Sequence, residues 1–198
     1  IAVKKYRNSI SKNIDRYGFD ISQRFEMAKL VAAKSHEEIS KNIDKYDLNL
    51  SQRFEIAKLA ASQIDNGVSI NIDKYQLKPE MLLEIAIIAA SHKGENISVV
   101  IGNYDFDQTQ RFEIAKLAVV QGDEIISKYI MNYDLDNNQC LEIAKMSASN
   151  PSGMFPIEGS FKNYRLSPEQ NFEVAKISAT YEGKAISAFI KDFNFDRP

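Results

Sequence analysis

The sequence predicts an all-α fold, a right-handed α-solenoid of about six 29-residue helix–turn–helix repeats. Three observations predict it: near-copies of one helix, two residue series with a common period, and helix-capping patterns at regular intervals. The stretch "SQRFEIAKLAASQ" begins at Ser51, and near-copies of it begin at Ser22 and Thr109. Three near-identical helical segments indicate that the same packing interface recurs along the chain.

Two independent series of residues set the period. The Phe or Leu that precedes a glutamate recurs at spacings of 29, 29, 29, 29 and 31, at Phe25, Phe54, Leu83, Phe112, Leu141 and Phe172. The second series keeps those spacings and adds one more of 29, at Tyr17, Tyr46, Tyr75, Tyr104, Tyr133, Tyr164 and Phe193. We therefore predict one continuous domain over 20–198, preceded at 1–19 by the end of another repeat, with repeats at 20–48, 49–77, 78–106, 107–135, 136–166 and 167–195.

The first helix of each repeat, helix A, is predicted to begin at a capping side chain. The copies read "DISQ", "NLSQ", "DQTQ", "DNNQ" and "SPEQ", each a polar residue followed three positions later by glutamine. Asp, Asn or Ser at the N-cap accepts a bond from the first turn, and the glutamine reaches back to the cap amide. The third repeat reads "KPEM", which keeps a proline but loses the capping side chain.

Each helix carries an apolar face at helical spacing. In the second repeat the predicted face of helix A comprises Phe54, Ile56, Ala57, Leu59, Ala60 and Ala61. Helix B, the second helix, shows one stripe in successive copies: Ile39, Ile43 and Tyr46, then Val68, Ile72 and Tyr75, then Ile126, Ile130 and Tyr133. We expect this stripe to be buried, and the residue two past each tyrosine, such as Leu48 or Leu77, to pack onto the core.

Composition sets the outer bounds on function. The 198 residues carry 25 Lys+Arg against 27 Asp+Glu, a formal charge of −2, which disfavours nucleic acid and anionic membranes as partners. Cys140 is the only cysteine, so an internal disulfide is impossible and a reducing compartment such as the cytoplasm fits best. Because the chain starts within a predicted helix and without methionine, we expect it to be a piece of a longer protein.

Motifs for catalysis, cofactors or metals are missing from the sequence. The histidines His36 and His92 fall in predicted A-to-B loops without ligand partners at metal-site spacing. Cys140 stands in the helix A position that Arg24, Arg53 and Arg111 hold, with no histidine nearby to activate it. The tyrosine series could stack bases as in some RNA-binding repeats, but its link to the Ile stripe favours core packing.

These helix pairs, with a bulky residue and alanines in helix A and an aromatic residue late in helix B, resemble the tetratricopeptide class. Its Trp-Leu-Gly-Tyr signature and its usual period of about 34 residues are missing here. The Lys-, Asn- and Ile-rich repeats also look like those of effectors that intracellular bacteria secrete into the host cytosol. The tetratricopeptide resemblance implies a curved scaffold that binds a peptide or protein.

The expected function is therefore a non-catalytic protein-interaction scaffold without cofactors. Two alternatives remain open at this point: a substrate-recruiting arm of an enzyme whose catalytic domain lies outside this chain, and a nucleic-acid-binding repeat array. Flanking sequence would decide the first, and a salt-dependent shift assay with single-stranded RNA would decide the second.

The predicted contact residues lie where the copies depart from their own pattern. The loop "NPSGMFPIEG" of the fifth repeat is two residues longer than its counterparts and carries Met154 and Phe155, which either bind a partner or cover the next repeat. The third repeat has an apolar surplus, which predicts a partner or self-association surface. Its residues are Leu82 in place of arginine, Ile87 in place of lysine, and Val99 and Val100 in place of Lys12 and Asn13.

Overall fold

The computed structural model describes residues 7–34, 36–63, 67–121, 125–149 and 161–181, and this part of the chain is all-α, as predicted. The chain divides into two compact units, 1–92 and 93–198, with the boundary inside helix α7. Each unit is described by itself below. None of the described helices has the length and apolar character that crossing a membrane requires.

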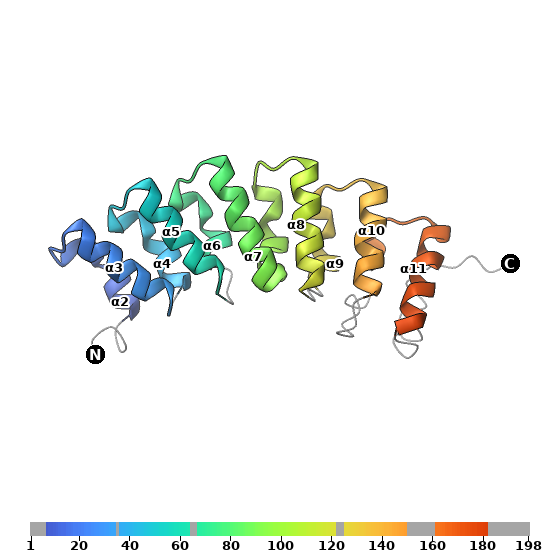
Figure 1. Cartoon of the computed structure of the whole chain (residues 1–198), viewed down its shortest axis with the longest axis horizontal. Helices are drawn as coiled ribbons and strands as arrows, with labels where there is room; N and C mark the ends of the chain where they lie inside the picture. The colour runs from blue at the N-terminus through green and yellow to red at the C-terminus, as the bar shows by residue number, and fades with distance from the viewer. Residues whose placement is uncertain (1–6, 35, 64–66, 122–124, 150–160, 182–198) are drawn as a thin grey trace. The chain divides into compact units, whose positions relative to one another are not determined.

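The first unit alternates longer helices with short helices that end in a 3-10 turn (Figure 1). Its elements are α2 (Arg7–Lys12), η1 (Ile14–Arg16), α3 (Ile21–Ala32), α4 (His36–Asn42), η2 (Ile43–Tyr46), α5 (Leu50–Ala61), α6 (Gly67–Ile70), η3 (Ile72–Tyr75) and the beginning of α7 (Pro79–Val100). Helix α3 packs against α4 and α5, and α4 packs against α2 and α6. The longer helices thus pack on each other, and so do the short ones.

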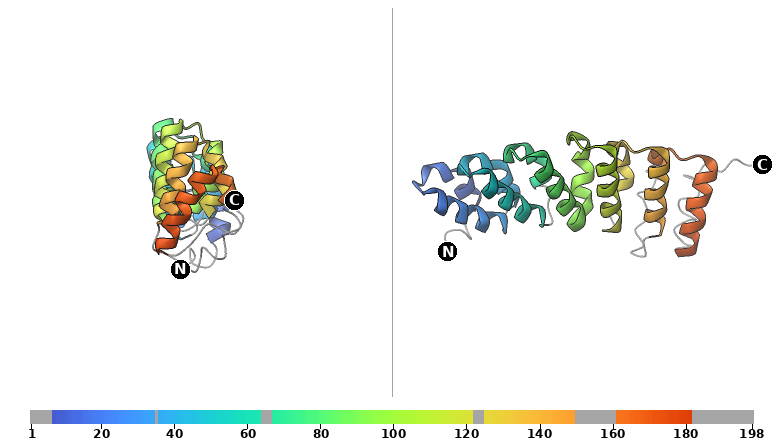
Figure 2. Two further views of the ribbon diagram at one scale, coloured as in Figure 1. Left: turned by 90° about the vertical axis from the view of Figure 1, so that its right-hand side faces the viewer. Right: turned by 45° about the horizontal axis from the view of Figure 1, so that its top comes forward.

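The second unit follows the same scheme. After the end of α7 it contains η4 (Ile101–Asn103), α8 (Gln108–Val120), α9 (Ile125–Tyr129), η5 (Ile130–Tyr133), α10 (Asn137–Ala148), η6 (Phe161–Tyr164) and α11 (Pro168–Tyr181). Helix α10 packs between α8 and α11, which the views in Figures 1 and 2 agree on. The predicted helix B of the sixth repeat lies outside the described residues.

The predicted capping boxes are confirmed. Helices α3, α5, α8 and α10 each begin after a cap residue whose side chain accepts a hydrogen bond from the backbone N–H of the glutamine three positions later. The side chain of that glutamine in turn accepts a hydrogen bond from the backbone N–H of the cap residue. The cap residues are Asp20, Asn49, Asp107 and Asp136. Helix α11 uses Ser167 and Gln170 in the same reciprocal way. Local sequence therefore fixes where these longer helices begin.

Two predictions about the helices were wrong in detail. Helix B is an α-helix only in its first part, and its last turn is a 3-10 helix. A left-handed residue such as Asp47 (φ 56°) or Asp134 (φ 51°) follows that turn. In the third repeat no loop separates the two predicted helices, because α7 is continuous from Pro79 to Val100. Both histidines therefore lie in helices rather than in loops, His36 as the first residue of α4 and His92 within α7, with its Nδ1 2.9 Å from the Ile88 carbonyl.

The helix B stripe forms the core, with exceptions at its margins. Ile39, Ile43 and Tyr46 are fully buried, and the later tyrosines from Tyr75 to Tyr164 are at most 5% exposed. Burial of these rings removes them from any role in stacking on bases. The expectation that Ile72 is buried like Ile43 was wrong, because its side chain remains partly exposed. Two members of the tyrosine series differ: Tyr17 is exposed, and Phe193 lies outside the described residues.

Helix A of the second repeat buries its alanines and one isoleucine and leaves its other bulky residues at the margin. Ile56, Ala57, Ala60 and Ala61 are buried, as predicted. The prediction that Phe54 and Leu59 belong to the same buried face was wrong, because both are only half-buried. The alanines let neighbouring helices approach closely, which leaves the larger side chains at the edges of the interface. Of the residues two past the tyrosines that were predicted to pack onto the core, Leu48 is buried and Leu77 is only half-buried.

A buried serine in helix B forms an inter-repeat bond that sequence analysis missed. Ser40 shares a hydrogen bond of 2.9 Å with the Tyr75 hydroxyl, and Ser98 shares one of 2.8 Å with that of Tyr133, both across 35 residues. Burial raises the pKa of Tyr46 to about 12, against a smaller opposite effect of the Ser11 hydroxyl. At Tyr75 and Tyr133 the ring therefore packs in the core while the hydroxyl links one repeat to the next.

Removing one side of this pair should cost more than removing both. Tyr133→Phe leaves the buried Ser98 hydroxyl without this partner, so we expect a loss of about 1–2 kcal/mol in the free energy of unfolding. Adding Ser98→Ala removes the second polar group, and the double variant should recover most of that loss. Urea unfolding of the four proteins measures the coupling; additive losses would show that the hydrogen bond contributes nothing.

A second inter-repeat bond satisfies the carbonyls freed where helix B tightens. The residue before the buried tyrosine donates to a carbonyl one repeat earlier: Lys45 to Lys12 (2.9 Å), Lys74 to Lys41 (2.8 Å), and Asn132 and Asn163 to Val99 (3.2 Å) and Lys128 (3.3 Å). The end of an α-helix leaves carbonyls without an internal partner, so these side chains cap the helix of the repeat before them.

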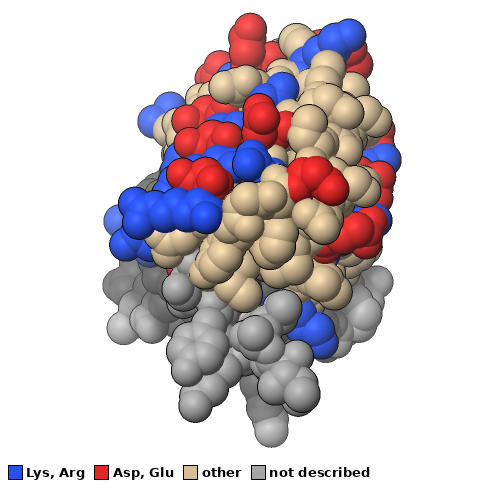
Figure 3. Space-filling view, turned by 90° about the vertical axis from the view of Figure 1, so that its left-hand side faces the viewer, with Lys and Arg blue, Asp and Glu red and all other residues tan. Residues whose placement is uncertain are grey.

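The exposed edge of helix A carries Glu/Lys ion pairs. Lys29 and Lys116 pair with the glutamate three residues earlier, whereas Lys58 and Lys145 pair with a glutamate of the next repeat, Glu84 at 3.5 Å and Glu173 at 2.7 Å. The hydrogen bond that Lys29 donates to the Glu26 carboxylate raises the pKa of Lys29. Lysines also lie over the ring four residues earlier, as Lys58 does 4.4 Å from the Phe54 centroid. On the face seen in Figure 3, acidic and basic side chains are intermixed.

Candidate functional site

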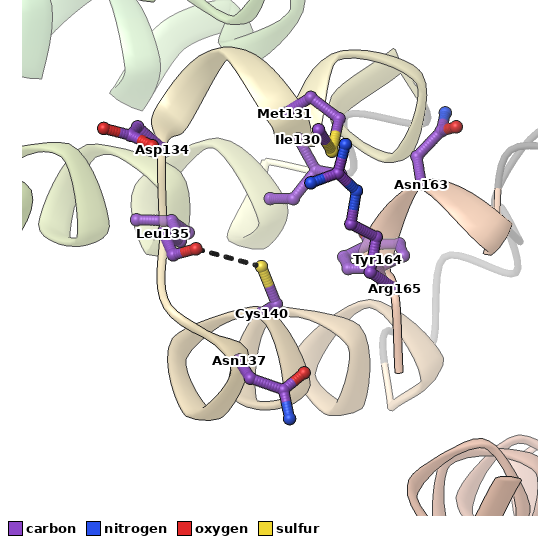
Figure 4. Close-up of a pocket in the computed structure, with 9 residues that line it drawn as sticks. All are labelled: Ile130, Met131, Asp134, Leu135, Asn137, Cys140, Asn163, Tyr164 and Arg165. Carbon is purple, nitrogen blue, oxygen red and sulfur yellow. Dashed lines mark hydrogen bonds between the residues drawn. The ribbon is translucent and has the colours of Figure 1, made fainter. Parts of the chain in front are cut away.

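A pocket of about 170 Å³ lies in the second unit, between the end of η5, the start of α10 and the end of η6 (Figure 4). Its lining residues are Ile130, Met131, Asp134, Leu135, Asn137, Cys140, Asn163, Tyr164 and Arg165. Two buried side chains, Ile130 and Tyr164, belong to the core stripe and fix the base of the pocket. The other lining residues come from helix ends and turns, which differ between repeats.

Two left-handed residues bring the pocket walls together. Asp134 follows η5 with φ 51°, and Arg165 follows η6 with φ 53°, each at the same position of its repeat. Asp134 then leads into the cap residue Asp136 and helix α10, which places Cys140 on the first turns of that helix. The Cys140 thiol lies 3.8 Å from the Leu135 carbonyl, to which it donates.

In other repeats an arginine occupies the position of Cys140 and bonds to neighbouring loops. Arg24 Nε donates to the Phe19 carbonyl at 3.0 Å, the acceptor equivalent to Leu135. Arg53 donates to the Gln76 side chain at 3.0 Å, and Arg111 donates to the Tyr104 carbonyl at 3.3 Å. Arg111 also lies 3.9 Å from Asp134, in the next left-handed position. Cysteine is much shorter than arginine, so this space is left open at Cys140.

Three departures from the sequence repeat meet in this pocket. The Met131 position is aspartate in three copies, the Cys140 position is arginine in three, and the Arg165 position is aspartate in three. The remaining copies differ as well, with Gly102 and Lys162, Leu82 and Asn171, and Gly18 and Gln76 at the three positions. Sequence analysis singled out only Cys140. The signal for the other two was present in the aligned repeats, but nothing in the sequence alone showed that the three positions share one cavity.

One acidic and one basic residue, Asp134 and Arg165, line the pocket beside the thiol of Cys140. Burial raises the pKa of the Cys140 thiol, and the nearby Asp136 carboxylate acts in the same direction, so the thiol stays protonated near neutral pH. A protonated thiol is a poor nucleophile. In Figure 4 the Arg165 guanidinium points toward Met131, whereas the Asp134 carboxylate points away from the pocket. This arrangement places the guanidinium of Arg165 beside the open space of the pocket, where it can bind a group.

The residues predicted for partner contact are placed separately in the two units. In the first unit Ile87 is 38% exposed and Leu82 is half-buried. In the second unit Val99 is 40% exposed and Val100 is half-buried. Ile87 and Val99 thus have the exposure that a contact residue needs, and their role in partner binding or self-association stays a prediction. Met154 and Phe155 lie outside the described residues.

Within the described ranges, no cluster of three or more His, Cys, Asp or Glu side chains could hold a metal ion. Comparison with models of protein families, with curated proteins and with solved structures found no match to this chain.

Proposed function

We propose that this chain is a non-catalytic scaffold, a tetratricopeptide-like α-solenoid of six 29-residue repeats that binds a protein or peptide partner. Recurrent hydrogen bonds support the architecture. Within each unit, capping boxes recur inside the repeats, and serine–tyrosine pairs and side-chain caps recur between them. Repeats of this kind stabilise one another through neighbouring interfaces and present an extended surface.

The observation that carries the binding function is the convergence of three departures on one pocket. Repeats that only stack gain from keeping the arginine that bonds to the neighbouring loops, as Arg111 does. The fifth repeat gives up that contact and leaves a cavity. It also places Arg165 in a left-handed conformation that aspartate or glycine adopts more readily. Features that cost stability and cluster in one place are typical of binding sites.

Site-specific photocrosslinking tests this function. A diazirine amino acid in place of Met131, which lines the pocket and is 43% exposed, should crosslink to a protein in a lysate of the cells that make this chain. The same probe in place of Val120, which is 63% exposed and does not line the pocket, is the matched control.

The crosslink must also depend on the pocket being open. Cys140→Arg combined with Arg165→Asp restores the arginine–aspartate pair found at Arg111 and Asp134, so it should fill the pocket without unfolding the chain. We expect the Met131 adduct to disappear in this variant. An adduct that persists there, or one that forms equally from position 120, would show that the pocket is not the contact site.

A further inference from the structure

The size of the pocket fits one side chain. Sites for small molecules usually measure about 300–1,000 Å³, whereas this pocket measures about 170 Å³. An apolar cavity of about 150 Å³ accommodates a single benzene ring. The occupant is therefore expected to be one side chain that a larger molecule presents.

The charge at the rim selects the chemistry of that side chain. Arg165 is exposed, and in the part of the chain that the structure describes no acidic side chain forms an ion pair with it. The neighbouring carboxylate of Asp134 lies 3.9 Å from Arg111 instead. A guanidinium presents its N–H donors as a planar fork that matches a carboxylate, so a carboxylate is the complementary group.

The walls select the length of the side chain. Met131, which is 43% exposed, supplies apolar surface between the base formed by Ile130 and Tyr164 and the guanidinium of Arg165 (Figure 4). The protonated thiol of Cys140 adds no negative charge, and the Asp134 carboxylate points away from the pocket, so Asp136 is the acidic side chain that acts on the thiol. Methylene groups gain free energy on such a surface, which favours glutamate, with two methylenes, over the shorter aspartate.

We propose that the pocket binds a glutamate side chain of a protein partner, with the carboxylate at Arg165 and the methylenes against Met131 and Ile130. This inference rests on the scaffold function proposed above. It assigns Arg165 as the residue that determines specificity and the departures at positions 131 and 140 as the ones that make room.

An NMR titration of the chain with a minimal probe tests the proposal. N-acetyl-glutamate N-methylamide carries the side chain and no other charge, and it should produce saturable shifts in the amide signals of Leu135, Cys140 and Arg165 below about 50 mM, as expected of weak single-side-chain binding. The glutamine analogue, which lacks the charge, should bind about fivefold more weakly or not at all, as expected when a rim ion pair is lost.

Two variants, each of which replaces one basic residue with a neutral one, separate specific binding from general electrostatic attraction. Arg165→Gln should weaken binding of the glutamate probe about fivefold. Lys162→Gln removes one positive charge from an exposed neighbour that does not line the pocket, and it should leave binding unchanged. Equal binding of the glutamine probe, equal losses in both variants, tighter binding of inorganic phosphate, or no saturable shift would each overturn the proposal.

The outcomes also distinguish this inference from the scaffold function. If the glutamate probe fails while the Met131 crosslink still depends on an open pocket, the scaffold function stands and the occupant is another side chain. Loss of the crosslink together with specific glutamate binding would instead leave a carboxylate site without a protein partner.

Discussion

Replacing Ile43 with alanine should lower the free energy of unfolding by about 2–5 kcal/mol, the usual cost of a large cavity in a packed core. Ile43 is fully buried in the stripe shared with Ile39 and Tyr46. Because the side chain is buried, its truncation leaves a cavity in the core. The surrounding helices cannot close this cavity fully, because the inter-repeat hydrogen bonds hold them in place. Urea unfolding followed by circular dichroism gives the free-energy difference.

Two matched substitutions calibrate this expectation. Ile72→Ala occupies the equivalent position in the next repeat, but because Ile72 is partly exposed the loss should stay under about 2 kcal/mol. Lys58→Ala removes an exposed ion pair and a contact with the Phe54 ring, which together should contribute under about 1 kcal/mol. Equal losses at Ile43 and Lys58 would contradict the assignment of buried and exposed positions.

Cys140→Arg alone should be less stable than the same change combined with Arg165→Asp, with a coupling energy of about 2 kcal/mol. The single substitution places a second guanidinium beside Arg165, and two like charges at short range repel each other. Aspartate at position 165 converts this repulsion into the attraction seen between Arg111 and Asp134. Aspartate also suits the left-handed conformation there better than arginine does.

The matched control for charge alone is Cys140→Gln, which fills part of the pocket without a second positive charge. In the Cys140→Gln background, arginine and aspartate at position 165 should differ in stability only by their different preference for the left-handed backbone conformation. A coupling energy near zero for the arginine variant would show that positions 140 and 165 do not share one cavity.

The sequence predicted those features that depend on neighbouring residues or on a single period. Capping boxes such as Asp136 with Gln139 need only four consecutive residues, and the stripe of Ile43 and Tyr46 needs only helical spacing. The 3-10 ends of helix B were not predictable in this way, because they depend on a lysine or asparagine from the following repeat that satisfies the freed carbonyls. The continuous helix α7 likewise lacks a signal, since "SHKGEN" reads as a loop.

The pocket was not predicted, because its three departures matter only in combination. Met131, Cys140 and Arg165 stand 34 residues apart from first to last, and each alone is an ordinary surface substitution. Only the packing of η5, α10 and η6 brings them to one cavity. The apolar residues of the third repeat were easier to recognise, because comparing the aligned repeats shows an apolar residue where another copy has a polar one.

The fifth repeat departs from the repeat pattern for binding and not for stability. This is tested by the free energy of unfolding in urea of the Cys140→Arg, Arg165→Asp variant, compared with that of the unaltered chain. We expect the variant to be at least as stable, because it fills a cavity and restores a pair that other repeats use. A variant less stable by more than about 1 kcal/mol would contradict the claim, since Cys140 and Arg165 would then be packing residues of the core.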